Sequence, residues 1–259
     1  MASAEDAIRI LGVFAHPDDD VYTLGGSLVL ERDRLELTLV FCTSGDAGPI
    51  WIDGVEPHEL GPVREQEQAA SMNALGVDAD VRFLRHPDYH LPNIPSGVLH
   101  GELDAVLREA QPQLVVTFGP DGLTGHHDHA FVGAATDAAV HRARADEGIV
   151  ARLLHVAVPR STVERFDAEL RASGDPQREE RSMLALRGVP DEQIAIEVDT
   201  RSVRETKLAG IEAHRTQIGE LERIPEDLRW VVLDTEWFVQ AWPPRAPSPA
   251  VATTLVPTS

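Results

Sequence analysis

The sequence predicts a single α/β domain of the Rossmann-like kind, with a mostly parallel sheet and helices on both of its faces. Short apolar runs alternate along the chain with segments of helical spacing, which is the pattern of parallel β–α–β units. The 259 residues are 42% hydrophobic and 25% charged, so the chain can bury one substantial core. Because Cys42 is the single cysteine, that core forms without an intrachain disulfide.

Each expected element has a local signal. Six apolar runs indicate buried strands, because each is short and bounded by polar or turn residues. They are 8–15, 35–42, 81–84, 114–118, 153–158 and 194–198. Apolar residues at helical spacing mark five segments, which are 21–32, 62–75, 96–110, 127–144 and 202–217. Pro62 is tolerated in a first helical turn and Gly76 is typical of a helix end, which supports the second of these helices.

The expected organisation is one catalytic domain over residues 1–242 and a tail over 243–259. The tail is rich in Pro, Ala, Ser and Thr, so we expect it to be flexible beyond its first residues. The polar segment 173–180 contains Gly and Pro and is expected to be a surface loop. No basic leader precedes the first apolar run and no apolar stretch is long enough to span a bilayer, which predicts a cytoplasmic protein.

The charge balance limits the partners. The chain has 23 basic and 43 acidic residues, a formal net charge of −20. A field of this sign repels phosphate backbones and anionic membrane surfaces, so we expect neither nucleic acid nor membrane as a partner. The sequence leaves open whether the chain forms a homo-oligomer.

The first chemical motif directly follows the first predicted strand and consists of Ala15, His16, Pro17, Asp18, Asp19 and Asp20. In open parallel sheets, ligands bind outside the carboxyl ends of the strands. Three adjacent carboxylates repel one another unless a cation is present, and a divalent metal supplies one. The alternative is an acidic helix N-terminus, where the carboxylates would favour the helix dipole.

The second motif, residues 119–129, follows the strand predicted at 114–118 and ends Gly-His-His-Asp-His. A dense set of histidines in one loop is hard to explain by packing, although a chance His-rich turn is the alternative. Both motifs are expected at the same edge of the sheet. Two histidines and one carboxylate with an open position suit a catalytic zinc or a non-haem iron.

Together, the AHPDDD and GHHDH motifs resemble the PIG-L / LmbE-like family of zinc-dependent N-deacetylases. This family includes the N-acetylglucosaminyl deacetylases of mycothiol and bacillithiol synthesis and mycothiol S-conjugate amidase. The resemblance covers roughly residues 8–217, and the chain has Asp20 where the family usually has Glu. It implies hydrolysis of the N-acetyl or N-acyl group of a small GlcNAc-type sugar or conjugate, with Zn²⁺ as cofactor and Fe²⁺ as an alternative native metal.

The resemblance also implies roles for individual residues. The implied metal ligands are His16, Asp19 and His129. Asp18 would be the general base that takes the proton of the attacking water. His126 would be a cation that stabilises the oxyanion and protonates the leaving amine, and Asp128 would orient a histidine.

Weaker similarities imply contacts with the substrate. Residues 43–48, which include Ser44 and Asp46, resemble the family's T-x-G-E-x-G loop. Arg64 lies in an R-x-x-E helix whose arginine commonly contacts the sugar, and Asp88 resembles an aspartate that accepts hydrogen bonds from sugar hydroxyls. The segment 213–217 resembles the end of a family helix and is expected to be mainly structural.

Departures from the family pattern favour a general LmbE-like deacetylase over either mycothiol enzyme. Thr124 stands where the mycothiol-pathway deacetylase has tyrosine, and residues 21–26 lack the lysine of the amidase branch. The alternatives are an amidase of a thiol conjugate or antibiotic intermediate, an iron enzyme with the same ligands, a nucleotide-binding module and a non-catalytic sugar-binding protein. The hypothesis of a nucleotide-binding module is disfavoured because the acidic turn after the first predicted strand lacks the G-x-G-x-x-G pattern.

Overall fold

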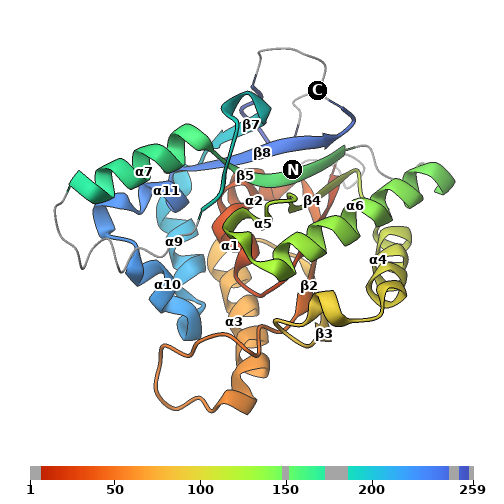
Figure 1. Ribbon diagram of the computed structural model, residues 1–259, viewed down its shortest axis with the longest axis horizontal. Coiled ribbons are helices and arrows are strands. Elements are labelled where there is room, and N and C mark those ends of the chain that lie inside the picture. The colour runs from red at the N-terminus through yellow and green to blue at the C-terminus, as the bar shows by residue number, and fades with distance from the viewer. Residues whose placement is uncertain (1–6, 148–151, 173–185, 245–250, 257–259) are drawn as a thin grey trace.

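The computed structural model describes residues 7–147, 152–172, 186–244 and 251–256. A central sheet lies between two layers of helices (Figure 1). The predicted α/β class with a mostly parallel sheet and helices on both faces is therefore confirmed. Among the described residues, no helix is long and apolar enough to cross a membrane.

The sheet has the order β3-β2-β1-β4-β5-β8-β7, and the short β6 pairs with β5 outside this path. Strands β1 to β5 are parallel to one another, whereas β8 is antiparallel to both β5 and β7. The strands are β1 (Ile8–Phe14), β2 (Leu35–Thr43), β3 (Asp80–His86), β4 (Leu114–Phe118), β5 (Arg152–Pro159), β6 (Gly188–Val189), β7 (Ile194–Asp199) and β8 (Thr235–Trp242). The six predicted strands are present, and β6 and β8 are additional.

The helices cover both faces of this sheet. Helix α2 packs with α3 and α9 on one face, and α4 packs with α6 on the other (Figure 1). The described α-helices are α1 (Asp19–Thr23), α2 (Gly25–Glu31), α3 (Leu60–Leu75), α4 (Ser96–Ala110), α5 (Gly122–Gly125), α6 (His127–Glu147), α7 (Arg160–Ala172), α9 (Arg204–Glu212), α10 (Ile218–Arg223) and α11 (Trp230–Leu233). Because both faces are covered, the central strands are continuous apolar runs instead of alternating ones.

The order of the strands reverses at β1. From β1 the chain moves to β2 and β3 on one side of the sheet, and then crosses back to β4 on the other side of β1. At such a switch point the loops after the two central strands separate and leave a crevice. The two chemical motifs of the sequence follow β1 and β4, so this topology brings them together.

The helix predicted over 21–32 is divided in two. Helix α1 ends at Thr23, Leu24 has a φ of −136°, and α2 begins at Gly25. The carboxylate of Glu236 in β8 accepts hydrogen bonds from the backbone N–H groups of Gly26 and Ser27, both 2.8 Å long. A second chain segment therefore caps α2 at its N-terminus, which local spacing could not reveal.

The expectation of a tail without fixed structure is wrong for residues 251–256. Leu255 and Val256 are fully buried in the hydrophobic core, and Ala252 forms a parallel bridge with Ile196 of β7. The composition of the tail predicted that the cost in conformational entropy would keep it flexible. Burial of these apolar side chains provides favourable free energy that offsets this cost. The loop predicted over 173–180 lies outside the described residues.

Candidate active site

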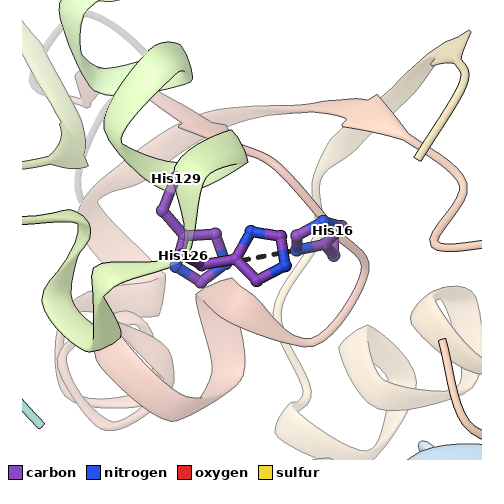
Figure 2. A group of neighbouring side chains, drawn as sticks. All are labelled: His16, His126 and His129. Atoms are coloured by element: carbon purple, nitrogen blue, oxygen red, sulfur yellow. Dashed lines mark hydrogen bonds between the residues drawn. The ribbon is translucent and has the colours of Figure 1, made fainter. Parts of the chain in front are cut away.

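Three histidines from two distant segments converge above the switch point. His16 lies on the loop after β1, His126 precedes α6 and His129 lies in the first turn of α6. Figure 2 shows their rings pointing toward one another. One ring nitrogen of each lies within 4.8 Å of the others, which makes the cluster a group that could hold a metal ion. The predicted convergence of the two motifs is therefore seen in the structure.

The donor atoms have spacings that fit a small divalent metal. His16 Nδ1 lies 3.2 Å from His129 Nε2. Asp19 Oδ1 lies 3.3 Å from His129 Nε2, and Asp19 Oδ2 lies 3.6 Å from His16 Nδ1. In a tetrahedral site with metal–nitrogen bonds of about 2.0–2.1 Å, two ligand atoms are about 3.3 Å apart. The two histidines and Asp19 therefore form a donor set of suitable size and chemistry.

Acceptor groups on the outer side of each ring direct the lone pairs inward: a carbonyl oxygen beside His129 and carboxylates beside His16. His129 Nδ1 lies 3.1 Å from the Gly122 carbonyl oxygen, to which only an N–H can donate. His16 Nε2 lies 2.9 Å from a carboxylate oxygen of Asp88 and 3.7 Å from one of Asp128. These contacts place the ring protons on the outside, so His129 Nε2 and His16 Nδ1 present lone pairs to the centre.

His126 has the opposite arrangement. The backbone N–H of Asp128 donates to His126 Nδ1 over 3.2 Å, so the proton of the neutral ring is on Nε2. Burial and electrostatic interaction with the adjacent His16 and His129 lower the pKa of His126 to about 4. This differs from the expectation of a cationic His126, because the ring is neutral at pH 7. The ring offers an N–H donor and not a third inward lone pair.

The metal-free cluster has a strong affinity for positive charge. Burial alone would lower the pKa of His16, but contacts with Asp128 and Asp88 and the charge of Asp19 outweigh it and raise that pKa to about 10. Despite burial, the adjacent His129 and His16 hold the pKa of Asp19 below its usual range. In the metal-free site, a proton on His16 thus supplies the positive charge near these carboxylates that a bound metal cation would otherwise supply.

Metal binding is therefore expected to release a proton. At pH 7.5, below the raised pKa of His16, zinc must displace about one proton from this ring, and the apparent affinity should fall about tenfold for each unit of decreasing pH. Calorimetric titration with zinc in buffers of different ionisation enthalpy measures the number released. Metal binding at pH 7.5 without proton release would remove His16 from the ligand set.

Asp18 lies beside the cluster in a strained backbone conformation. Its φ is 102°, which costs a non-glycine residue on the order of 1–3 kcal/mol and is typical of functional sites. Its backbone N–H donates to Gln68 Oε1 and its carboxylate lies 3.0 Å from Arg64 Nη2. Burial raises the pKa of Asp18 well above its usual range, and the charge of Arg64 opposes this. Such a carboxyl group is suited to take up a proton and return it.

The residues expected to contact the substrate have different positions. Arg64 lines the pocket, but its guanidinium is buried and donates to the carbonyl oxygens of Pro17 and Gly45. The structure does not bring Ser44 and Asp46 into the pocket. The Ser44 hydroxyl donates to Glu65, and Asp46 is exposed on the loop after β2.

Asp88 lines the pocket and also supports His16. One of its oxygens lies 2.9 Å from His16 Nε2, and the other accepts the backbone N–H of Ala47. Burial is opposed by His16, and the pKa of Asp88 is lowered to about 2. A carboxylate that fixes a ligand histidine in this way typically contributes 10- to 100-fold to metal affinity or activity.

We therefore expect Asp88→Asn to weaken metal binding by about 10- to 100-fold. The measurement is a competition with a metal-binding dye of known affinity. Asp137→Asn is the matched control, because Asp137 holds His155 at 2.8 Å outside the pocket. An Asp88→Asn protein with unchanged metal affinity and a raised KM would instead assign Asp88 to the substrate alone.

The pocket around the cluster has a volume of about 570 Å³ and includes residues that sequence reasoning missed. Tyr89 is the clearest case: its φ is 65°, its backbone N–H donates to Asp88 and Asp128, and its ring packs at 4.8 Å on His126. The other missed residues include Tyr22, Glu220 and Trp237, and Gln217 from the segment expected to be mainly structural also lines the pocket. Only Tyr89 had a local signal, since it directly follows Asp88.

The fold and the site together define an enzyme of the hydrolase class with a candidate metal centre. The family described as PIG-L, GlcNAc-PI de-N-acetylase, matches residues 11–140, and the chain belongs to this family. The chain is therefore a hydrolase that acts on a C–N bond.

The chain is also similar to individual known proteins. A 1D-myo-inositol 2-acetamido-2-deoxy-alpha-D-glucopyranoside deacetylase of Acidothermus cellulolyticus is 33% identical, over 81% of this chain and 80% of the relative. The N,N'-diacetylchitobiose deacetylase of Pyrococcus horikoshii has a TM-score of 0.62 at 21% identity, over 91% of this chain and 84% of that one. The 4-carboxy-2-hydroxymuconate hydratase of Pseudomonas putida has a TM-score of 0.65 at 20% identity, over 94% and 100%. At these identities the two structures support the fold alone.

Proposed function

We propose that this enzyme is a zinc-dependent N-deacetylase of a GlcNAc-type sugar or sugar conjugate. The observation that carries the proposal is the convergence of His16 Nδ1, His129 Nε2 and the Asp19 carboxylate at spacings of 3.2–3.6 Å, with Asp18 on the same turn. The substrate class rests on the family and on relatives named for an acetamido sugar. The 570 Å³ pocket is large enough for a sugar with a substituent.

The residues would share the work of amide hydrolysis as follows. A zinc ion held by His16, Asp19 and His129 would lower the pKa of water and polarise the amide carbonyl. Asp18 takes the proton of the attacking water, and its raised pKa suits it to return that proton to the departing amine. The Nε2–H of neutral His126 donates to the oxygen on which negative charge develops.

The surrounding residues hold this arrangement in place. Asp88 and Asp128 orient His16, and Arg64 keeps Asp18 directed into the pocket. This division of roles assigns protonation of the amine to Asp18, whereas the family resemblance implied His126. The reason is that a ring with a pKa of about 4 is not in its acidic imidazolium form at pH 7.

The proposal is tested by loading the metal-free protein with zinc or iron(II) and assaying release of primary amine. The substrates are N-acetylglucosamine, its inositol glycoside and N,N'-diacetylchitobiose. Amine release and an equal quantity of acetate with zinc are expected, and a dialysed metal-free sample is the control. Failure of both metal forms to hydrolyse any of the three would contradict the proposal, and activity with iron alone would reassign the metal.

A further inference from the structure

The pocket has two chemically different ends. The catalytic cluster lies above β1 and β4, near the middle of the sheet. On the side of β2 and β3 the pocket is lined by polar groups, including Arg64 and Asp88. On the side of β5, β8 and α11 the lining includes Thr235 and Glu236 of β8 and six apolar residues. We call these six the apolar wall: Val156, Ala157, Val158, Val231, Val232 and Trp237.

The apolar wall offers few polar groups to a ligand. Its β5 and β8 segments pair with each other, as Val156 does with Phe238 and Ala157 with Trp237, so their backbone groups are used within the sheet. The neighbouring Glu236 also lines the pocket, but its carboxylate is held by the buried ammonium of Lys207 at 2.7 Å and by two backbone N–H groups of α2.

Two other charged residues of the pocket are directed elsewhere. Glu220 is close enough to Asp18 to affect its pKa and therefore belongs with the polar end. The Arg223 guanidinium lies over the ring of Trp51 at 4.6 Å. A polyol bound against the apolar wall would lose its water without gaining partners, which is unfavourable.

We infer that the substrate carries an apolar alkyl or aryl group, which binds against the apolar wall while the sugar lies toward Asp88. This inference rests on the proposed function and narrows its substrate class. The apolar group belongs either to the N-acyl chain or to the aglycone, and the same wall would recognise both. An inositol glycoside, which has a polyol in the aglycone position, should be a poorer substrate than an alkyl glycoside.

Two substrate series distinguish the sources. One lengthens the acyl chain of N-acylglucosamine from acetyl to hexanoyl, and the other lengthens the aglycone of N-acetylglucosaminides from methyl to octyl. In the series whose added alkyl group binds against the apolar wall, kcat/KM should rise by up to about fourfold for each methylene. Flat profiles in both series, or preference for the inositol glycoside over the octyl glycoside, would overturn the inference.

Substitutions in the apolar wall test whether it causes the preference for the longer substrates. Val232→Thr and Val158→Thr keep side-chain shape but add a hydroxyl, so each should lower the ratio of kcat/KM for the longest to the shortest member of the responsive series. Val106→Thr is the control, because Val106 is 7% exposed, like Val158, but lies in α4 and does not line the pocket. A ratio that is unchanged in both wall variants would reject the wall as the binding surface.

Binding without turnover separates this inference from the proposed function. Calorimetry with zinc-loaded Asp18→Asn compares hexanoyl with acetyl glucosamine and octyl with methyl N-acetylglucosaminide. Tighter binding of a longer ligand supports the wall even where wild-type protein hydrolyses none of these amides. Equal binding within both pairs rejects the inference, even where N-acetylglucosamine is hydrolysed.

Discussion

Replacement of His16, Asp19 or His129 with alanine is expected to remove nearly all bound metal and, with it, turnover. Each residue supplies one of three inward-facing donors, whose atoms lie 3.2–3.6 Å apart. Loss of one leaves two protein ligands, which is fewer than catalytic zinc sites use. Metal content after dialysis against a weak chelator, measured by mass spectrometry, is the primary measurement.

Thermal unfolding provides a second measurement of the same effect. Metal that binds only the folded protein stabilises it by RT ln(1 + [M]/Kd), so added zinc should raise the Tm of wild-type protein and not that of the three variants. His155→Ala is the matched control, because His155 is a buried histidine paired to an aspartate outside the pocket. Full metal occupancy in any one of the three ligand variants would exclude that residue as a ligand.

Asp18→Asn is expected to retain metal and to lose about 10²- to 10⁴-fold in kcat, the range of a general base. The asparagine side chain keeps the shape of Asp18 but cannot take a proton. Because the base must be ionised, wild-type kcat should fall as the pH drops below the raised pKa of Asp18, and this acid limb should flatten in the variant. The profile belongs to the whole coupled site, which includes Arg64 and Glu220.

Asp20→Asn is the control for this experiment. Asp20 is fully buried on the same turn, and burial raises its pKa to about 7, but it does not line the pocket. Its carboxylate instead accepts a hydrogen bond from Gln68. Turnover close to wild type is expected in Asp20→Asn. Wild-type kcat in Asp18→Asn would end the role of Asp18 as base.

The amino-acid sequence determined the fold class and the position of the active site. Alternation of apolar runs with helical segments is a local property, and burial of parallel strands on both faces makes each run continuous. Two clusters of potential ligands after predicted strands then had to meet at one edge of the sheet. That argument needed no knowledge of loop geometry, and it placed the two motifs together. The resemblance to the family then implied His16, Asp19 and His129 as the ligands among their residues, and the structure brings these three side chains close to one another.

Other features depended on contacts between residues distant in sequence, and only the tertiary structure decided them. Strand β8 contains Glu236 and Gln240, which obscure its apolar pattern, and it exists because β5 and β7 pair with it. Leu255 and Val256 are held by the core in a tail whose composition suggested disorder.

The protonation states in the site also depend on contacts between residues distant in sequence. His126 and His16 are the same residue type, yet burial beside two histidines lowers the pKa of one to about 4, and nearby carboxylates raise the other to about 10. The difference comes from Asp88 and Asp128, which lie far from His16 in the sequence. A motif specifies which groups are present, whereas their charges depend on desolvation and on neighbours that only the folded chain supplies.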